Sequence, residues 1–225
     1  MKGLVLKDIF GIKSFLKGTL MSIIIISACF FFSVGTEGII AAVAIMCATM
    51  IVTTYTLDER YGWQRFAMAM PVSAKQYVGA KYLVNLIFCT AGVAVGAVIA
   101  LLLQAYKHAV DIPALLAVCA AALGICLLFG AFIIPLLTYF GAEKARLIMM
   151  GVIAIPTVLA YVVLDKVDLS SMVFTDAQVK LILAGVIAAV ILIVLLSYLI
   201  SVKIFQKKNF RQKEAAAQLP LVRRE

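Results

Sequence analysis

Six long apolar stretches alternate with short polar segments along the chain. They cover residues 19–36, 38–57, 82–104, 112–139, 147–164 and 179–204. None of them carries Asp, Glu, Lys or Arg in its central part, and a charge at the centre of a membrane helix costs about 2.5–3.5 kcal/mol on insertion scales. A membrane-spanning helix needs about 20 mainly apolar residues. The pattern therefore predicts an all-α membrane protein with six transmembrane helices.

The composition also indicates a chain that is solvated mainly by lipid. Hydrophobic residues make up 65% of it and charged residues only 14%, and its mean hydropathy is +1.13. A typical soluble domain is nearer to half apolar and a quarter charged. Since six helices use most of the 225 residues, we expect one transmembrane domain at 19–205, an interfacial segment at 1–18 and a basic tail at 206–225.

The Lys and Arg residues gather in every second gap between the apolar stretches. All of them except Lys107, Lys166 and Lys180 lie before the first stretch, in the second gap, in the fourth gap or from Lys203 onward. Cytoplasmic segments of membrane proteins carry the excess of Lys and Arg. The bias predicts that both termini face the cytoplasm.

An alternative for the first stretch is a cleaved leader, because residues 26–29 resemble a lipoprotein processing site after a basic, apolar start. The apolar sequence continues beyond Cys29 through 30–32, which favours an uncleaved membrane helix. All five cysteines lie within apolar stretches, without a Cys-x-x-Cys or Cys/His cluster. We expect free thiols, with neither disulfides nor a metal site.

The N-terminal segment has the period of an amphipathic helix over residues 4–18. The face that we expect to be apolar consists of Val5, Ile9, Ile12 and Leu16. We expect the lysines of this segment, including Lys7, to lie away from that face and toward anionic lipid headgroups. The alternative is a basic leader that only fixes the topology.

The second gap contains the only long internal loop, residues 58–73, and this loop has another amphipathic pattern. One helical face consists of Trp63, Phe66, Ala67 and Met70. The pattern ends before Pro71, since the residue before a proline disfavours helix. Tryptophan and arginine in an exposed apolar patch are typical of a protein interface. The loop therefore predicts a docking surface for a partner.

Polar residues on both sides of this pattern suggest where its helices begin. Asp58 and Glu59 precede it, at a place where a helix N-terminus favours negative charge. Ser73 and Gln76 have the spacing of a capping box. We expect the capped helix to continue into the third apolar stretch.

The order of residues in and after this loop forms a motif. The loop reads Asp58-Glu59-Arg60-x-Gly62-Trp63-x-Arg65, then Pro71-Val72-Ser73 and Lys81-Tyr82, and the N-terminus reads Lys2-Gly3-Leu4-x-x-Lys7-Asp8. This combination resembles the type-2 ABC exporter permeases, in particular their small six-span subfamily in Gram-positive bacteria. In that family the loop after the second span is a coupling helix that docks on a separate ATPase subunit, and the N-terminal segment is an elbow helix.

The resemblance implies a set of interface residues and partners. The coupling interface would comprise Asp58, Glu59, Arg60, Trp63, Arg65, Phe66, Met70 and Pro71. The cargo would be small amphipathic peptides or toxic amphiphiles. The chain would lie in a bacterial plasma membrane, in contact with lipid, and would pair with ABC ATPase subunits and with a second copy of itself or a sister permease. We expect no nucleic-acid partner.

The sequence lacks the groups that other mechanisms need. There is no G-x-x-x-x-G-K-S/T phosphate loop, so ATP and magnesium would bind to the partner ATPase and this chain would hold no cofactor and catalyse no reaction. No carboxylate lies at membrane depth, which argues against a proton-coupled secondary carrier. The remaining alternative is a non-transporting scaffold or regulator that recruits a cytoplasmic protein. Within the spans, the expected helix-packing residues are Gly92, Gly96 and Asn85.

Overall fold

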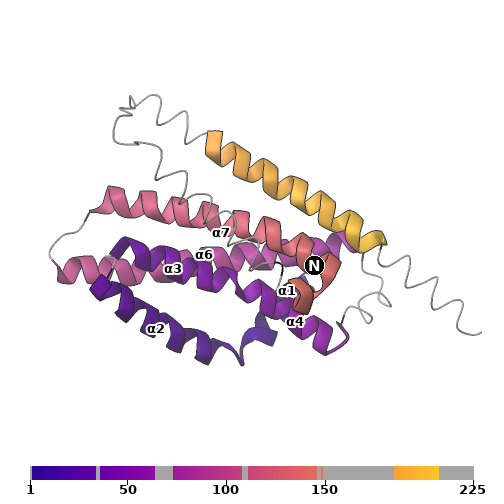
Figure 1. Ribbon diagram of the computed structural model, residues 1–225, viewed down its shortest axis with the longest axis horizontal. Coiled ribbons are helices and arrows are strands. Elements are labelled where there is room, and N and C mark those ends of the chain that lie inside the picture. The colour runs from indigo at the N-terminus through magenta and orange to yellow at the C-terminus, as the bar shows by residue number, and fades with distance from the viewer. Residues whose placement is uncertain are drawn as a thin grey trace, which may run out of the picture.

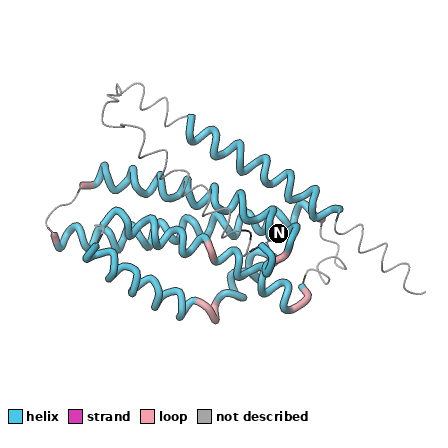
Figure 2. The backbone as a smooth tube through the Cα atoms, in the orientation of Figure 1, coloured by secondary structure: helices cyan, strands magenta, loops and turns pink. Residues whose placement is uncertain are grey.

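The computed structural model describes residues 2–33, 36–63, 73–107, 111–145, 148 and 185–207, and these residues form helices joined by short turns, with no strand among them (Figure 2). The helices are α1 (Lys2–Ile12), α2 (Leu16–Ser33), α3 (Thr36–Ala48), α4 (Met50–Arg60), α6 (Ala74–Tyr106) and α7 (Ile112–Phe140). A last helix covers Gly185–Lys207. The predicted all-α class is confirmed for this part of the chain.

The long helices lie side by side in one bundle (Figure 1). Helix α3 packs against α2, α6 and α7, and the short helix α1 lies at one end of the bundle against α4 and α6. The last helix is held to α6 by the hydroxyl of Tyr82, which lies 2.6 Å from Ser197 Oγ and 3.1 Å from Ser201 Oγ. Ser197 also donates a hydrogen bond to the carbonyl of Ala131 in α7.

Four of these helical segments are long and apolar enough to cross a membrane. They are Gly38–Arg60, which combines most of α3 with α4, and then Ala74–Tyr106, Ile112–Phe140 and Gly185–Lys207. The pair Lys2–Ile12 and Leu16–Cys29, bent by 64°, gives a fifth if it counts as one span. The part of the chain that is described is therefore an all-helical membrane protein with four to five candidate spans. The predicted stretch at 147–164 lies almost wholly outside it, and the number six stays a prediction.

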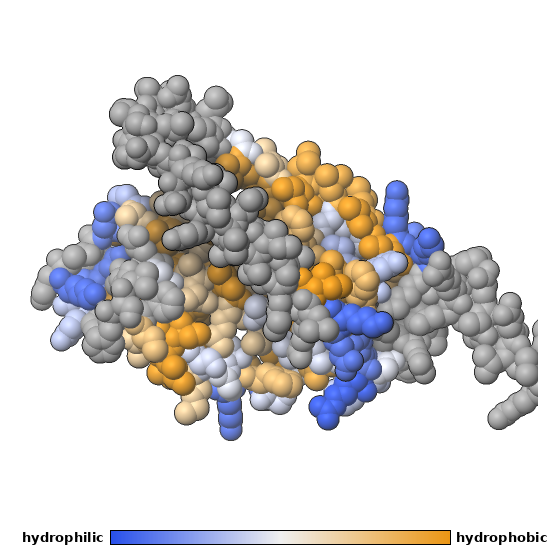
Figure 3. Space-filling view, in the orientation of Figure 1, coloured by the Kyte–Doolittle hydropathy of each residue, from blue (hydrophilic) through white to orange (hydrophobic). Residues whose placement is uncertain are grey.

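The surface distribution of polar residues agrees with a bundle that crosses a membrane. On the face shown in Figure 3, apolar residues cover the middle of the bundle, and most hydrophilic residues gather toward its two ends. Exposed apolar side chains are expected where lipid replaces water as the solvent.

Polar side chains cap the first turns of the two longest helices. The Ser73 hydroxyl accepts a hydrogen bond from the Gln76 backbone N–H at 3.3 Å, and Gln76 Oε1 accepts one from the Ser73 N–H at 3.2 Å. This confirms the predicted capping box, from which α6 runs without a break into the apolar stretch. Asp111 caps α7 in the same way, because its carboxylate accepts from the Ala114 N–H at 3.2 Å.

The predicted apolar face of the N-terminal helix is wrong in part. Ile12 is buried and Val5 packs against the core, but Ile9 and Leu16 are exposed. The helix ends at Ile12 and the chain bends before α2, so Leu16 belongs to another helix. The buried face of α1 instead includes Asp8, which is only 4% exposed.

Two glycines bring α6 close to α3. A Cβ atom on Gly92 would lie 2.6 Å from Cys47 Cβ and 3.1 Å from Ala44 Cα, and one on Gly96 would lie 3.0 Å from Ile40 Cα. Because glycine has no Cβ atom, the backbones of α3 and α6 can approach closely at these two positions, as they do at small residues between membrane helices.

This close approach predicts that two glycine substitutions on different helices differ in their effect on stability. Gly92→Ala should lower the stability of the folded protein by about 1–3 kcal/mol, because the new methyl group overpacks the contact with α3. Gly124→Ala is the matched control, since a Cβ there would meet nothing within 4 Å, and it should leave the stability unchanged or higher. The measurement is thermal unfolding in detergent, and equal midpoints for the two variants would contradict the packing.

Candidate functional site

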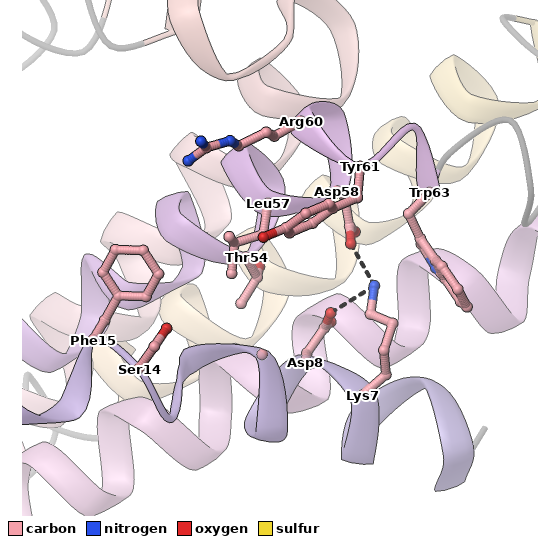
Figure 4. A pocket seen from close by; sticks show the side chains of 11 residues that line it. Lys7, Asp8, Ser14, Phe15, Thr54, Leu57, Asp58, Arg60, Tyr61 and Trp63 are labelled. Carbon is pink, nitrogen blue, oxygen red and sulfur yellow. Dashed lines mark hydrogen bonds and ion pairs between the residues drawn. The ribbon is translucent and has the colours of Figure 1, made fainter.

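Four charged side chains meet at the end of the bundle where α1, α4 and α6 come together. Lys81 Nζ lies 2.9 Å from Asp8 Oδ2 and 2.7 Å from Asp58 Oδ2. Lys7 Nζ lies 3.0 Å from Asp8 Oδ1 and pairs with Asp58 Oδ1 as well (Figure 4). Asp8, Asp58 and Lys81 are almost completely buried. We call these four residues the ion cluster.

Aromatic side chains complete the surroundings of the ion cluster. The Tyr77 hydroxyl donates a hydrogen bond to Asp58 Oδ2 at 3.1 Å. Lys81 Nζ lies 4.9 Å from the centre of the Tyr55 ring, and Lys7 Nζ lies 4.6 Å from the centre of the Trp63 ring. A cation over an aromatic face is stabilised by the ring quadrupole. The two lysines are therefore held by rings as well as by carboxylates.

The charges of the ion cluster balance, with two lysines against two aspartates. Each of the four carboxylate oxygens has a cationic partner. Burying an ion costs several kcal/mol unless nearby charges and hydrogen bonds compensate for lost water. The balanced arrangement is thus a condition for burying these groups, and it fixes α1, α4 and α6 in one relative position.

The ion cluster joins residues from both sides of the predicted docking loop, residues 58–73. Asp58 is in the last turn of α4, before the loop, and Lys81 is in α6, after it. Trp63 extends this connection, since it packs against an apolar cluster that contains Tyr77 of α6 and Phe205 of the last helix. Both flanks of the loop are therefore anchored to the body of the bundle.

The predicted helix N-terminus at Asp58 and Glu59 is wrong. Both residues lie in the last turn of α4, which continues to Arg60 and is followed by Gly62 with φ of 63°. Asp58 turns inward to the ion cluster. The Glu59 carboxylate instead accepts a hydrogen bond from the Ala142 N–H at 2.8 Å.

Glu59 therefore stabilises a helical turn far away in the sequence. Residues 142–145 are helical, and a carboxylate is favourable at the N-terminus of such a turn. Gly141, with φ of 85°, lies so close that a Cβ atom there would be 2.6 Å from Glu59 Oε1. The contact joins the end of α4 to the end of α7.

The remaining predicted residues have different surroundings. Arg60 is exposed and Trp63 is partly buried. Asn85 is buried beside Gly130, and its Oδ1 atom has no hydrogen-bond partner within the described structure. Gly92 and Gly96 lie against α3 as described above. The other predicted interface residues lie outside the described residues; they are Arg65, Phe66, Met70 and Pro71.

The ion cluster was not predicted from the sequence, although all four of its members stand in the motifs quoted above. Lys7 was predicted to face lipid headgroups, but it points between Asp8 and Asp58 (Figure 4). The available signal was that lysines and aspartates stand at the ends of apolar stretches, where unpaired burial is costly. Within the ranges described, no group of three or more His, Cys, Asp or Glu residues could hold a metal ion.

A comparison with known protein families finds a match over nearly the whole chain. The sequence model of a family described as "ABC-2 family transporter protein" matches residues 3–206. No curated protein and no solved structure matches the chain. The match covers all helices from α1 to the end of Gly185–Lys207 except their outermost residues.

The ion cluster predicts a large effect for removing one of its charges. Lys81→Met should destabilise the protein by about 3–5 kcal/mol, because it leaves two buried carboxylates with only Lys7. Lys75→Met is the matched control, since Lys75 is exposed on the same helix, and it should change stability by less than about 0.5 kcal/mol. Thermal unfolding in detergent measures both.

A second substitution that restores the charge balance tests whether unbalanced charge is the reason why Lys81→Met lowers stability. Adding Asp8→Asn to Lys81→Met leaves one cation and one anion, so part of the lost stability should return. If the double variant is less stable than Lys81→Met, charge balance is not what the cluster provides.

Proposed function

Because the chain belongs to the ABC-2 family of transporter membrane proteins, we propose that it works as an exporter subunit in which residues 58–73 receive the movement of a separate ATPase. It is the permease component, a transport subunit that is not itself catalytic. ABC-2 permeases pair with ATPase subunits. ATP and magnesium would then bind to that partner.

The anchoring of the loop at both ends is the observation that carries this proposal. Asp58 before the loop pairs directly with Lys81 after it, and Lys81 also pairs with Asp8 of α1. A force on a segment held in this way is passed to α4, α6 and α1 together, rather than being absorbed by one flexible connection. A docking element that drives helix movement requires such a rigid attachment.

The proposed orientation places the ion cluster at the cytoplasmic side. The segment 58–81 is rich in basic residues, as is the chain beyond Lys203, and such segments stay in the cytoplasm. The ATPase, which needs cellular ATP, would meet the loop there. Two membrane domains would face each other, as two copies of this chain or as this chain and a sister permease, in a bacterial plasma membrane.

An apolar cavity supports a small amphipathic peptide or toxic amphiphile as the cargo. It has a volume of about 400 Å³ and lies between α6, α7 and the last helix. Its lining includes Leu86, Leu127 and Val194, with polar atoms only near Asn85 and two tyrosines. A mainly apolar wall with a few polar groups fits a molecule that is itself amphipathic.

The docking proposal predicts that two apolar residues of the loop are needed for ATPase binding. The double variant Phe66→Ala and Met70→Ala should weaken co-purification of the ATPase and ATP-driven export by more than about tenfold, because central apolar residues dominate interface energy. Leu102→Ala with Tyr106→Ala is the matched control: it has the same spacing on an exposed part of α6 at its other end.

Three outcomes would decide against the proposal. ATPase binding and export that are unchanged in the loop variant would remove the docking role of residues 58–73. Cargo flux driven by an ion gradient without ATP would indicate a secondary carrier. Co-purification of a partner without a phosphate loop, and no export, would indicate a scaffold.

A further inference from the structure

A second cavity lies beside the ion cluster, between α4 and the bend that joins α1 to α2. Its volume is about 530 Å³. Figure 4 shows Lys7 and Asp8 of α1 on one side of it, and Arg60 at the end of α4 with the following Tyr61 on the other. Ser14 and Phe15, from the bend, line the end that is farther from the ion cluster.

The charged residues that line this cavity differ in whether they already have a partner of opposite charge. All four carboxylate oxygens of Asp8 and Asp58 have cationic partners, so a further cation would have to compete with Lys7 and Lys81 for them. Arg60, by contrast, makes no hydrogen bond or ion pair with any described residue, and its side chain extends over the cavity (Figure 4). Since a guanidinium has five N–H donors and the ion cluster is neutral, the cavity favours an anion.

The surface next to the cavity favours an anion that carries an apolar tail. Phe15 leads directly into α2, whose first turns expose Leu20, Met21 and Ile24. Apolar residues exposed on a membrane helix are solvated by acyl chains. An anionic group bound beside Arg60 would therefore have its apolar tail next to the exposed apolar residues of α2.

We propose that this cavity binds the phosphate headgroup of an anionic phospholipid, with Arg60 as its main ligand. Arginine is suited to this role because its planar fork makes paired hydrogen bonds with phosphate oxygens. This binding requires neither an ATPase nor cargo, so it does not depend on the proposed function.

The position of the tryptophan provides a direct test. The chain has one tryptophan, and Trp63 lines this cavity, so quenching of its fluorescence by brominated lipid reports occupancy. The full chain is reconstituted alone in phosphatidylcholine bilayers, and brominated phosphatidylglycerol or brominated phosphatidylcholine is added in rising mole fraction. We expect brominated phosphatidylglycerol to reach half of its maximal quenching at a mole fraction about fivefold lower than brominated phosphatidylcholine does. This is about the gain in affinity for an anionic lipid that one juxtamembrane arginine gives.

Three variants distinguish a site from general surface charge. Arg60→Gln should abolish the preference for phosphatidylglycerol, whereas Arg60→Lys should keep part of it. Lys203→Gln, an exposed basic residue of the last helix that does not line the cavity, should keep nearly all of it. Equal preference in Arg60→Gln and in the unchanged chain would overturn the proposal.

A soluble phosphate ester separates a lipid from a free anion. Glycerol phosphate at millimolar concentration, added to the chain in phosphatidylcholine bilayers that contain brominated phosphatidylglycerol, should not relieve the quenching, because it lacks the acyl chains that contact α2. Relief by glycerol phosphate that requires Arg60 would show a site for soluble phosphates and would reject the lipid.

Discussion

A lysine and two aspartates can be buried at the end of an apolar bundle only when their charges are neutralised on the spot. Lys81 reaches one oxygen of Asp8 and one of Asp58, and Lys7 reaches the other two. All four ion pairs form only when α1, α4 and α6 are together. The position of α1 against α4 and α6 is therefore specified by electrostatics, in a protein whose other helix contacts are mostly apolar and less selective.

The helices could be predicted from the sequence because lipid imposes a simple rule on it. Apolar stretches of suitable length had to be helical, and the Ser73 capping box marked the start of α6. The partners of charged residues could not be predicted in this way. Nothing local indicates that Lys7 pairs with Asp58, or that Glu59 hydrogen-bonds Ala142, because each contact joins positions far apart in the chain.

The predicted apolar face of α1 was wrong in part for the same reason, because it depends on partners that are far away in the sequence. Periodicity assigns the apolar residues of a helix to its buried face, but Asp8 belongs to that face because Lys81 meets it there. The bend after Ile12 then gives Leu16 to another helix. Asp58 shows a related error: its charge suggested the N-terminus of a helix, but it lies in the last turn of α4, where Lys81 of α6 pairs with it.

The chain order of the ion cluster has a consequence for biosynthesis. Lys7, Asp8 and Asp58 leave the ribosome before Lys81, so for a time two carboxylates share a single cation. During that interval they must remain hydrated, and α1 cannot take up its final place at the end of the bundle. Insertion of α6 is then the event that locks the N-terminal helix in place, and a nascent chain arrested before residue 81 should still have that helix accessible to water.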